Sequence, residues 1–184
     1  MTPLRLAVII GSTREGRTGD RVARWFVDQA DRHDDLSVTV VDLGDYDFPT
    51  SYPAEPTASV RAFVGEVGRA DAFVVVTPEY NHSFPASLKQ AIDYAYDEWQ
   101  AKPVGFVSYG CRSTGLHAVD QLRTVFTALH AMTVRDVVGI DLLHGDPTPP
   151  HVDQLRQDTR VLLDQLRWWG LTLRDGREAR PYVS

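Results

Sequence analysis

The chain has few of the features that stabilise small secreted proteins. It has 184 residues and one cysteine, Cys111, so neither an intramolecular disulfide nor a cysteine-based zinc site can form within it. A single cysteine is typical of proteins that work in a reducing compartment. We therefore expect a cytoplasmic protein.

The chain also lacks a block of basic residues and a long apolar run near its start. Its 19 lysines and arginines are outnumbered by 25 aspartates and glutamates, and the formal net charge is −6. This charge disfavours binding to nucleic acid or to an anionic membrane surface. The first apolar run, "LRLAVII", covers residues 4–10. It is too short for the core of a signal peptide or for a membrane span, so we expect a soluble protein.

The apolar content is nevertheless sufficient for a sizeable core. Hydrophobic residues make up 43% of the sequence, and the length suits one domain. We expect residues 1–184 to form a single domain, with a polar tail at residues 171–184 that the pattern does not place.

Short apolar runs alternate with helical periodicity along the chain. The runs predict strands at residues 4–10, 36–43, 71–78, 102–110 and 131–140, and the periodicity predicts helices at 20–30, 59–69, 85–95, 116–129 and 152–169. This alternation is typical of an α/β fold with a parallel sheet and helices on both faces. Five strands suit the flavodoxin-like doubly wound order 2-1-3-4-5, in which loops at the carboxyl ends of the strands line the ligand crevice. Thr18 or Asp20 is the expected cap of the first helix, and Ser83 that of the third.

The loop after the first strand, "GSTREGRT", has the composition of a phosphate-binding loop. Hydroxyl side chains and guanidinium groups lie next to the free N–H groups of the following helix, and they belong to Ser12, Thr13, Arg14, Arg17 and Thr18. The loop departs from a Walker A motif because Arg17 stands at the lysine position, and Asp42 is a candidate Walker B aspartate. The alternatives are a nucleotide-hydrolysing loop, a different phosphate-binding loop, and an ordinary turn with solvated charges.

The loop after the third strand, "TPEYNHSFP", is stiffened by two prolines. We expect its backbone N–H and C=O groups to be free, since neither a helix nor the sheet uses them. Tyr80 offers an aromatic surface and Asn81 a two-sided amide, which together suit a flat heteroaromatic ligand. The alternative is a well-packed connection with Tyr80 in the core.

The other reactive or aromatic side chains have plainer interpretations. Cys111 is expected to be an incidental loop residue and His82 an exposed one. His144 and His151 lack the close spacing of a metal-binding pair, so the sequence predicts no metal site. Trp168–Trp169 cannot both face one core, which makes one of them a candidate for a subunit interface.

Three segments in this order resemble the NADPH-dependent FMN reductase family of flavodoxin-like flavoproteins. They are "GSTREGR" (residues 11–17), "TPEYNHSFPASLKQAIDY" (residues 77–94), and "KPVGFVSYG" with the helix after it (residues 102–123). The similarity covers residues 6–123, and the T-P-E-Y-N segment is its most specific part. The chain departs from the family at Arg17 and Gly19, where many members have serine and asparagine. It also has Thr114–Gly115 where the family has two glycines.

The resemblance implies a flavodoxin-like domain that binds one FMN non-covalently. It implies that the phosphate is held by Ser12, Arg14, Arg17 and Thr18, that the isoalloxazine ring is bordered by Pro78, Glu79, Tyr80 and Asn81, and that its other side is closed by Tyr109 and Gly110. Asp20, which is close to the implied phosphate, is expected to cap its helix and face away. A homodimer or homotetramer is implied as well.

The resemblance also implies an oxidoreductase. NADPH or NADH would pass hydride to flavin N5, and a flavin, quinone or similar small-molecule acceptor would then enter the same space, which gives ping-pong kinetics. No side-chain acid or base is required, so no catalytic residue is predicted. Backbone N–H groups near Glu79–Asn81 are candidates for stabilising charge on the reduced ring. The alternatives are a flavodoxin-type electron carrier and, less favoured, a P-loop-like nucleotide-binding protein.

Overall fold

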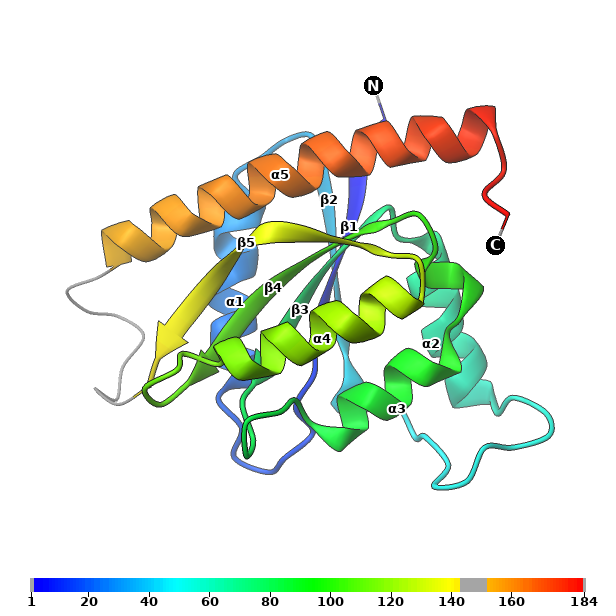
Figure 1. The fold of residues 1–184 in the computed structure, drawn as a ribbon, viewed down its shortest axis with the longest axis horizontal. Coiled ribbons are helices and arrows are strands. Elements are labelled where there is room, and N and C mark those ends of the chain that lie inside the picture. Colours follow the sequence, from blue (N-terminus) through cyan, green and yellow to red (C-terminus); the bar gives the residue numbers. More distant parts are fainter. Residues whose placement is uncertain (1, 143–151, 184) are drawn as a thin grey trace.

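The computed structural model describes residues 2–142 and 152–183. A five-stranded parallel sheet in the order β2-β1-β3-β4-β5 lies at its centre, which confirms the predicted order (Figure 1). In chain order the elements are β1 (Leu4–Ile10), α1 (Gly19–Ala30), β2 (Leu36–Asp42), α2 (Ala58–Arg69), β3 (Ala72–Pro78), α3 (Ala86–Tyr94), β4 (Pro103–Gly110), α4 (Leu116–Ala128), β5 (Met132–Asp141) and α5 (Val152–Ala179). Single-turn 3₁₀ helices follow β2 at Leu43–Asp45 and α3 at Asp97–Trp99.

Two layers of helices cover the sheet and bury a core on each face (Figure 1). The core under α1 and α5 includes Val22, Phe26, Leu162 and Leu166. The core under α2, α3 and α4 includes Phe63, Ile92, Trp99, Leu122 and Phe126. Burial of each such side chain contributes about 1.5–3 kcal/mol, so both layers are needed for stability.

The central strands lie between both layers. Every residue of β3 is buried, and every residue of β1 except Arg5 is buried. The edge strand β2 instead leaves most of its side chains partly or fully exposed. Burial on both faces explains why β1 and β3 are nearly continuous apolar runs in the sequence. The loops that follow these two strands therefore start from the most thoroughly packed part of the sheet.

The start of α1 differs from the prediction. Thr18 occupies the N-cap position, but its side chain makes no capping hydrogen bond. Asp20 does not cap the helix either, because its carboxylate pairs with Arg17 at 2.7 Å. The first N–H groups of α1 are consequently left without a side-chain cap.

Two further helices depart from their predicted ends or caps. Ser83 does not cap α3, because its hydroxyl donates to Gln121 of α4 at 2.7 Å. The last helix runs well beyond the predicted residues 152–169, so that most of the tail at 171–184 is helical. Although α5 has 28 residues, no helix in the described ranges combines the length and hydrophobicity needed to span a membrane.

A buried carboxylate at the amino edge of the sheet ties three elements together. Asp71, which is 1% exposed, accepts hydrogen bonds from Nε and Nη2 of Arg5 at 2.9 and 2.8 Å. Arg174 and Arg177 of α5 each approach it to 3.6 Å. Burial by itself raises the pKa of the Asp71 carboxyl. The hydrogen bonds from Arg5 and the charges of Arg5 and Arg174 lower it by more, so that the pKa lies below its usual value. Asp71, which lies directly before β3, thus links that strand to β1 and to α5.

Asp71→Asn should lower the free energy of unfolding at pH 7 by roughly 2–4 kcal/mol, because it removes a buried charge from its arginine partners. The folded-state pKa of Asp71 lies below the unfolded value, so its contribution is complete above the unfolded pKa and is lost as the pH falls through the folded pKa. Urea unfolding of wild type and variant should therefore converge below about pH 4. Exposed Asp28→Asn is the control, and equal stability of Asp71→Asn and wild type at pH 7 would contradict this role.

Candidate functional site

The carboxyl ends of β1 and β3 lie side by side, and the loops that follow them lead away to opposite sides of the sheet. The pairing of these strands ends at Ile10 and Val76, and the Gly11 N–H extends it by donating to the Val76 carbonyl at 2.9 Å. Gly11 has no room for a side chain, since a Cβ there would lie 2.9 Å from Cδ2 of Leu88. This point is the topological switch of a doubly wound sheet, where such folds bind their ligands.

The side chain of Arg17 fastens the loop at residues 11–18 to the end of β2. Its Nη1 donates to the Ser12 carbonyl at 2.6 Å and to Oδ1 of Asp42 at 2.8 Å, and its Nη2 donates to Oδ2 of Asp42 at 2.5 Å. Burial lowers the pKa of the guanidinium, but Asp42 and Asp20 raise this pKa above its usual value. The expectation that Asp20 faces away is therefore wrong. Both carboxylate oxygens of Asp42 accept hydrogen bonds from Arg17, so Asp42 is not free to act as the candidate magnesium ligand.

The remainder of this loop forms a cradle that fits a phosphate group. Gly16 turns the backbone at φ 68°. The hollow beside it has a volume of about 350 Å³ and is lined by Thr13, Arg14, Glu15, Gly16, Arg17, Asp20, Gly44 and Asp45. Within the described residues, no hydrogen bond is found for the backbone N–H groups of Glu15, Gly16, Thr18 and Gly19. Free N–H groups at a helix N-terminus bind anions.

The charges around this cradle are mixed. Arg14 is exposed and has no side-chain partner among the described residues, so its guanidinium is available to an anion. Glu15, Asp20 and Asp45 also line the hollow, and Arg17 is already neutralised by Asp42. Among the described residues, Arg14, the backbone N–H groups and the hydroxyls of Thr13 and Thr18 are therefore donors available to a phosphate.

The loop after β3 forms a tight hairpin turn. Tyr80 and Ser83 exchange backbone hydrogen bonds of 2.8 and 3.0 Å. Asn81 and His82 between them have φ angles of 50° and 63°, as in a type I′ turn. The Glu79 N–H donates to a β4 carbonyl at 3.1 Å. The expectation of free backbone groups is therefore wrong for Glu79 and Tyr80. In the described part of the chain it holds for the N–H groups of Asn81 and His82.

Tyr80 links this hairpin to the cradle formed by the loop after β1. Its hydroxyl lies 3.0 Å from the hydroxyl of Ser12, which is buried. The Tyr80 side chain is 36% exposed, so the alternative that placed Tyr80 in the core is wrong. One edge of the ring is thus fixed at the loop after β1, and a large part of its surface remains available for a ligand.

Glu79 connects the hairpin to the start of α4. Its Oε2 accepts hydrogen bonds from Oγ of Ser113 at 2.8 Å and from the His117 N–H at 3.1 Å. The N-cap residue Gly115 has no side chain to do this, so Glu79 satisfies an N–H group of α4 from a different element. Thr114 beside it has φ 52°, which costs a β-branched residue on the order of 1–3 kcal/mol. This backbone angle explains a family preference for glycine there.

Tyr109 lies at the same edge, and its hydroxyl is close to the side chains of Ser12 and Tyr80. The side chain is buried in the core under α1, and its hydroxyl lies where a Cβ on Gly19 would come within 2.9 Å. Burial raises the pKa of the Tyr109 phenol, which stays protonated. The Tyr109 hydroxyl thus lies beside Ser12 and Gly19, next to the cradle loop, and Gly110 follows at the end of β4. Glycine at position 19, where many family members have asparagine, is explained by this contact.

The structure therefore brings the predicted site residues to one edge of the sheet. These residues are Ser12, Arg14, Arg17, Thr18, Pro78, Glu79, Tyr80, Asn81, Tyr109 and Gly110. Sequence reasoning considered Asp42 only as a metal ligand and missed Ser113 and His117 altogether. Asp42 ends β2 at the carboxyl edge of the sheet, and this position could have indicated that it pairs with a residue of the neighbouring loop after β1. His144 and His151 lie outside the described residues.

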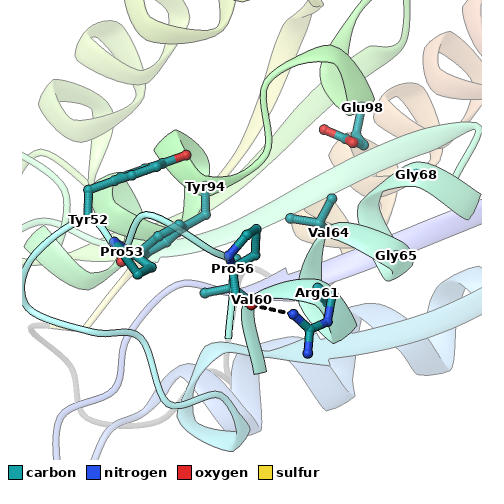
Figure 2. A pocket seen from close by; sticks show the side chains of 10 residues that line it. All are labelled: Tyr52, Pro53, Pro56, Val60, Arg61, Val64, Gly65, Gly68, Tyr94 and Glu98. Carbon is teal, nitrogen blue, oxygen red and sulfur yellow. Dashed lines mark hydrogen bonds between the residues drawn. The ribbon is translucent and has the colours of Figure 1, made fainter. Parts of the chain in front are cut away.

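A separate hollow of about 490 Å³ lies between α2, the loop before it and the end of α3 (Figure 2). Tyr52 stacks on Tyr94 there with ring centroids 5.0 Å apart, and Arg61 donates to the Pro56 carbonyl. None of the predicted site residues lines this hollow, so it is distinct from the cradle and hairpin.

Comparison with known proteins gives consistent results. The model of the NADPH-dependent FMN reductase family matches residues 4–145. A quinone reductase of Pseudomonas putida is 36% identical over 177 residues, which cover 89% of this chain and 93% of that protein. An NAD(P)H-dependent FMN reductase of Schizosaccharomyces pombe is 36% identical over 126 residues, 62% of each chain. A solved oxidoreductase structure from Corynebacterium diphtheriae has a TM-score of 0.78 at 18% identity, covering 94% of this chain and 99% of that one.

The fold and the two loops at its switch point define a flavodoxin-like α/β protein. Because the family model matches well over half of the chain, the chain belongs to the NADPH-dependent FMN reductase family. It matches 62% of the length of the Schizosaccharomyces pombe relative and 59% of that of an FMN reductase from Nectria sp.

Proposed function

We propose that this chain binds FMN at the carboxyl edge of the sheet and uses NADPH or NADH to reduce small-molecule acceptors. One observation carries the proposal: the cradle, which can bind an anion, lies beside the partly exposed Tyr80 of the hairpin at the switch point of the sheet. The chain also belongs to the NADPH-dependent FMN reductase family. FMN has one phosphate and one flat ring, and the two loops offer a partner for each. Residues 1–184 would then act as one FMN-binding domain.

On the phosphate side, Arg14 and the backbone N–H groups of Glu15, Gly16, Thr18 and Gly19, for which the described residues offer no partner, make the direct contacts, with the Thr18 hydroxyl beside them. Arg17 acts as a positioning residue, because its guanidinium holds the Ser12 carbonyl against Asp42. This role differs from the direct phosphate contact that the family resemblance implies for Arg17. A phosphate monoester needs neither a lysine nor a magnesium ligand, so the departure from a Walker A motif is no obstacle.

On the ring side, Tyr80 and Asn81 border the flat surface, and Gly110 lies across from them. The N–H groups of Asn81 and His82, which have no partner within residues 2–142 and 152–183, are backbone donors available to an electron-rich ring edge. FMN, when bound, supplies the chemistry of accepting hydride from the nicotinamide and passing electrons to the acceptor. The protein binds, orients and shields, so no side chain is assigned as a catalytic acid or base.

The two alternatives are less well supported. A P-loop function needs a cation for the β- and γ-phosphates and an acidic magnesium ligand, yet Arg17 and Asp42 are paired with each other. A flavodoxin-type carrier shares the fold and the cofactor. Relatives at 30–36% identity are described as FMN reductases, quinone reductases and an azoreductase. These descriptions favour an enzyme with a small-molecule acceptor, working in the reducing cytoplasm, where the exposed thiol of Cys111 stays free.

Arg14→Ala should raise the Kd for FMN by roughly 10–100-fold and that for riboflavin by less than about 3-fold, because it removes a charge-assisted hydrogen bond to the phosphate alone. Arg17→Ala and Asp42→Asn should weaken both ligands, since each releases the loop that positions Ser12 and Tyr80. Titration by quenching of flavin fluorescence measures both constants. Arg21→Ala, an exposed arginine of α1, is the matched control; equal losses for FMN and riboflavin in Arg14→Ala would exclude this loop as the phosphate site.

Steady-state oxidation of NADPH with a quinone acceptor should show ping-pong kinetics, because nicotinamide and acceptor would use the same space in turn. Double-reciprocal plots at several fixed quinone concentrations should be parallel. Intersecting lines would show that both substrates bind together and would contradict a shared site. Absence of turnover with quinones and free flavins in FMN-loaded protein would favour the electron carrier.

We further propose that the chain forms a homodimer or homotetramer. Trp168 and Trp169 in the middle of α5 are 60% and 37% exposed, and their rings contact each other with centroids 4.7 Å apart. Exposed aromatic residues of this size are enriched in subunit interfaces. Light scattering at micromolar concentration should give a mass of two or four chains, and Trp168→Ala should shift it toward one chain. A monomeric wild type would contradict the proposal.

A further inference from the structure

We propose that Glu79, His82 and His117 form a binding site for a divalent first-row transition metal, with Zn²⁺ as the representative ion. One ligand atom from each residue lies within 4.8 Å of the others. Glu79 and His82 come from the hairpin after β3, and His117 from the first turn of α4, 38 residues away from Glu79. The sequence predicted no metal site because the three residues have no motif spacing and meet only through the fold.

The carboxylate is held in place before any metal binds. Both hydrogen bonds that Glu79 accepts, from Ser113 and from the His117 N–H, go to Oε2. Its Oε1 accepts no hydrogen bond within the described residues and is therefore available as a ligand atom. Because the His117 backbone donates to the same carboxylate, the position of α4 is fixed relative to Glu79. This arrangement resembles the outer-shell hydrogen bonding that orients metal ligands.

The two imidazoles are brought together by a second set of contacts. Their rings stack with centroids 4.3 Å apart and planes 11° from parallel. The His82 carbonyl accepts a hydrogen bond from Nε2 of Gln121 at 2.8 Å, and Oε1 of Gln121 accepts one from Ser83 at 2.7 Å. Gln121 lies one turn along α4 from His117, so it ties the hairpin to the helix that carries the third ligand. His82 has a left-handed φ of 63°, and its ring contacts that of His117 on α4.

Two imidazoles and one carboxylate match the preference of Zn²⁺ and of neighbouring first-row metals. Zinc–ligand bonds of about 2.0–2.2 Å in a tetrahedral site require ligand atoms about 3.4 Å apart. Both histidines are exposed, so rotation of their side chains can close the remaining distance. Three protein ligands leave one coordination position for water or for an oxygen of a small molecule. Glu79 and His82 flank the proposed ring site, so that position would lie near it, but metal binding does not depend on FMN.

Isothermal titration of the chelator-treated full-length protein with Zn²⁺ tests the site. Wild type should bind one Zn²⁺ per chain, and His117→Ala and His82→Asn should each raise the Kd by at least about 10-fold. Asparagine is chosen at position 82 because it tolerates a positive φ. His33→Asn, which removes an imidazole away from the cluster, is the control and should leave the Kd unchanged. Circular dichroism of each variant checks that it is folded.

The titration is run with and without FMN, so that its result stays separate from the flavin proposal. One-to-one binding that both cluster variants weaken and the control does not would establish the site, even in protein that fails to bind FMN. Undiminished Zn²⁺ binding by folded His82→Asn and His117→Ala would place the metal elsewhere and overturn the proposal. Absence of binding by wild type up to about 1 mM Zn²⁺ would overturn it as well.

Discussion

The pairing of β1 with β3 is the constraint on which the rest of the site depends. Both strands are buried between two helix layers, and the Gly11 N–H extends their pairing by donating to the Val76 carbonyl. The chain leaves β1 toward β2 and leaves β3 toward β4, so the two following loops open a crevice at the carboxyl edge. Apolar packing and backbone pairing of the sheet, rather than contacts between polar side chains, thus place the cradle next to the hairpin.

Polar contacts then fix the loops relative to this frame. Arg17 fastens the first loop to Asp42, Tyr80 meets Ser12, and Glu79 reaches the start of α4. Arg17, which stands at the lysine position of a Walker A motif, therefore pairs with Asp42 of the protein itself. In the proposed function, Arg14 and the backbone N–H groups of the loop before α1 make the direct phosphate contacts instead.

The strands, the sheet order and the location of the candidate site could be predicted from the sequence. The apolar runs at β1 and β3 indicate strands that are buried on both faces. The pairings between distant residues could not be predicted. The partner of Arg17 is 25 residues away, and nothing in the local sequence distinguishes a phosphate-binding arginine from one that holds a strand. The hairpin was missed because Asn81 and His82 adopt positive φ without the glycine that signals such a turn. Glu79 and His117 likewise meet only in the folded chain.

We propose that the crevice holds an FMN that NAD(P)H can reduce. The most direct measurement mixes FMN-loaded protein with NADPH in an anaerobic stopped-flow instrument and follows the visible absorbance of the bound flavin. This absorbance should bleach at a rate at least equal to steady-state turnover. Protein that takes up FMN but leaves its absorbance unchanged over that time, or that takes up no FMN at all, would contradict this proposal.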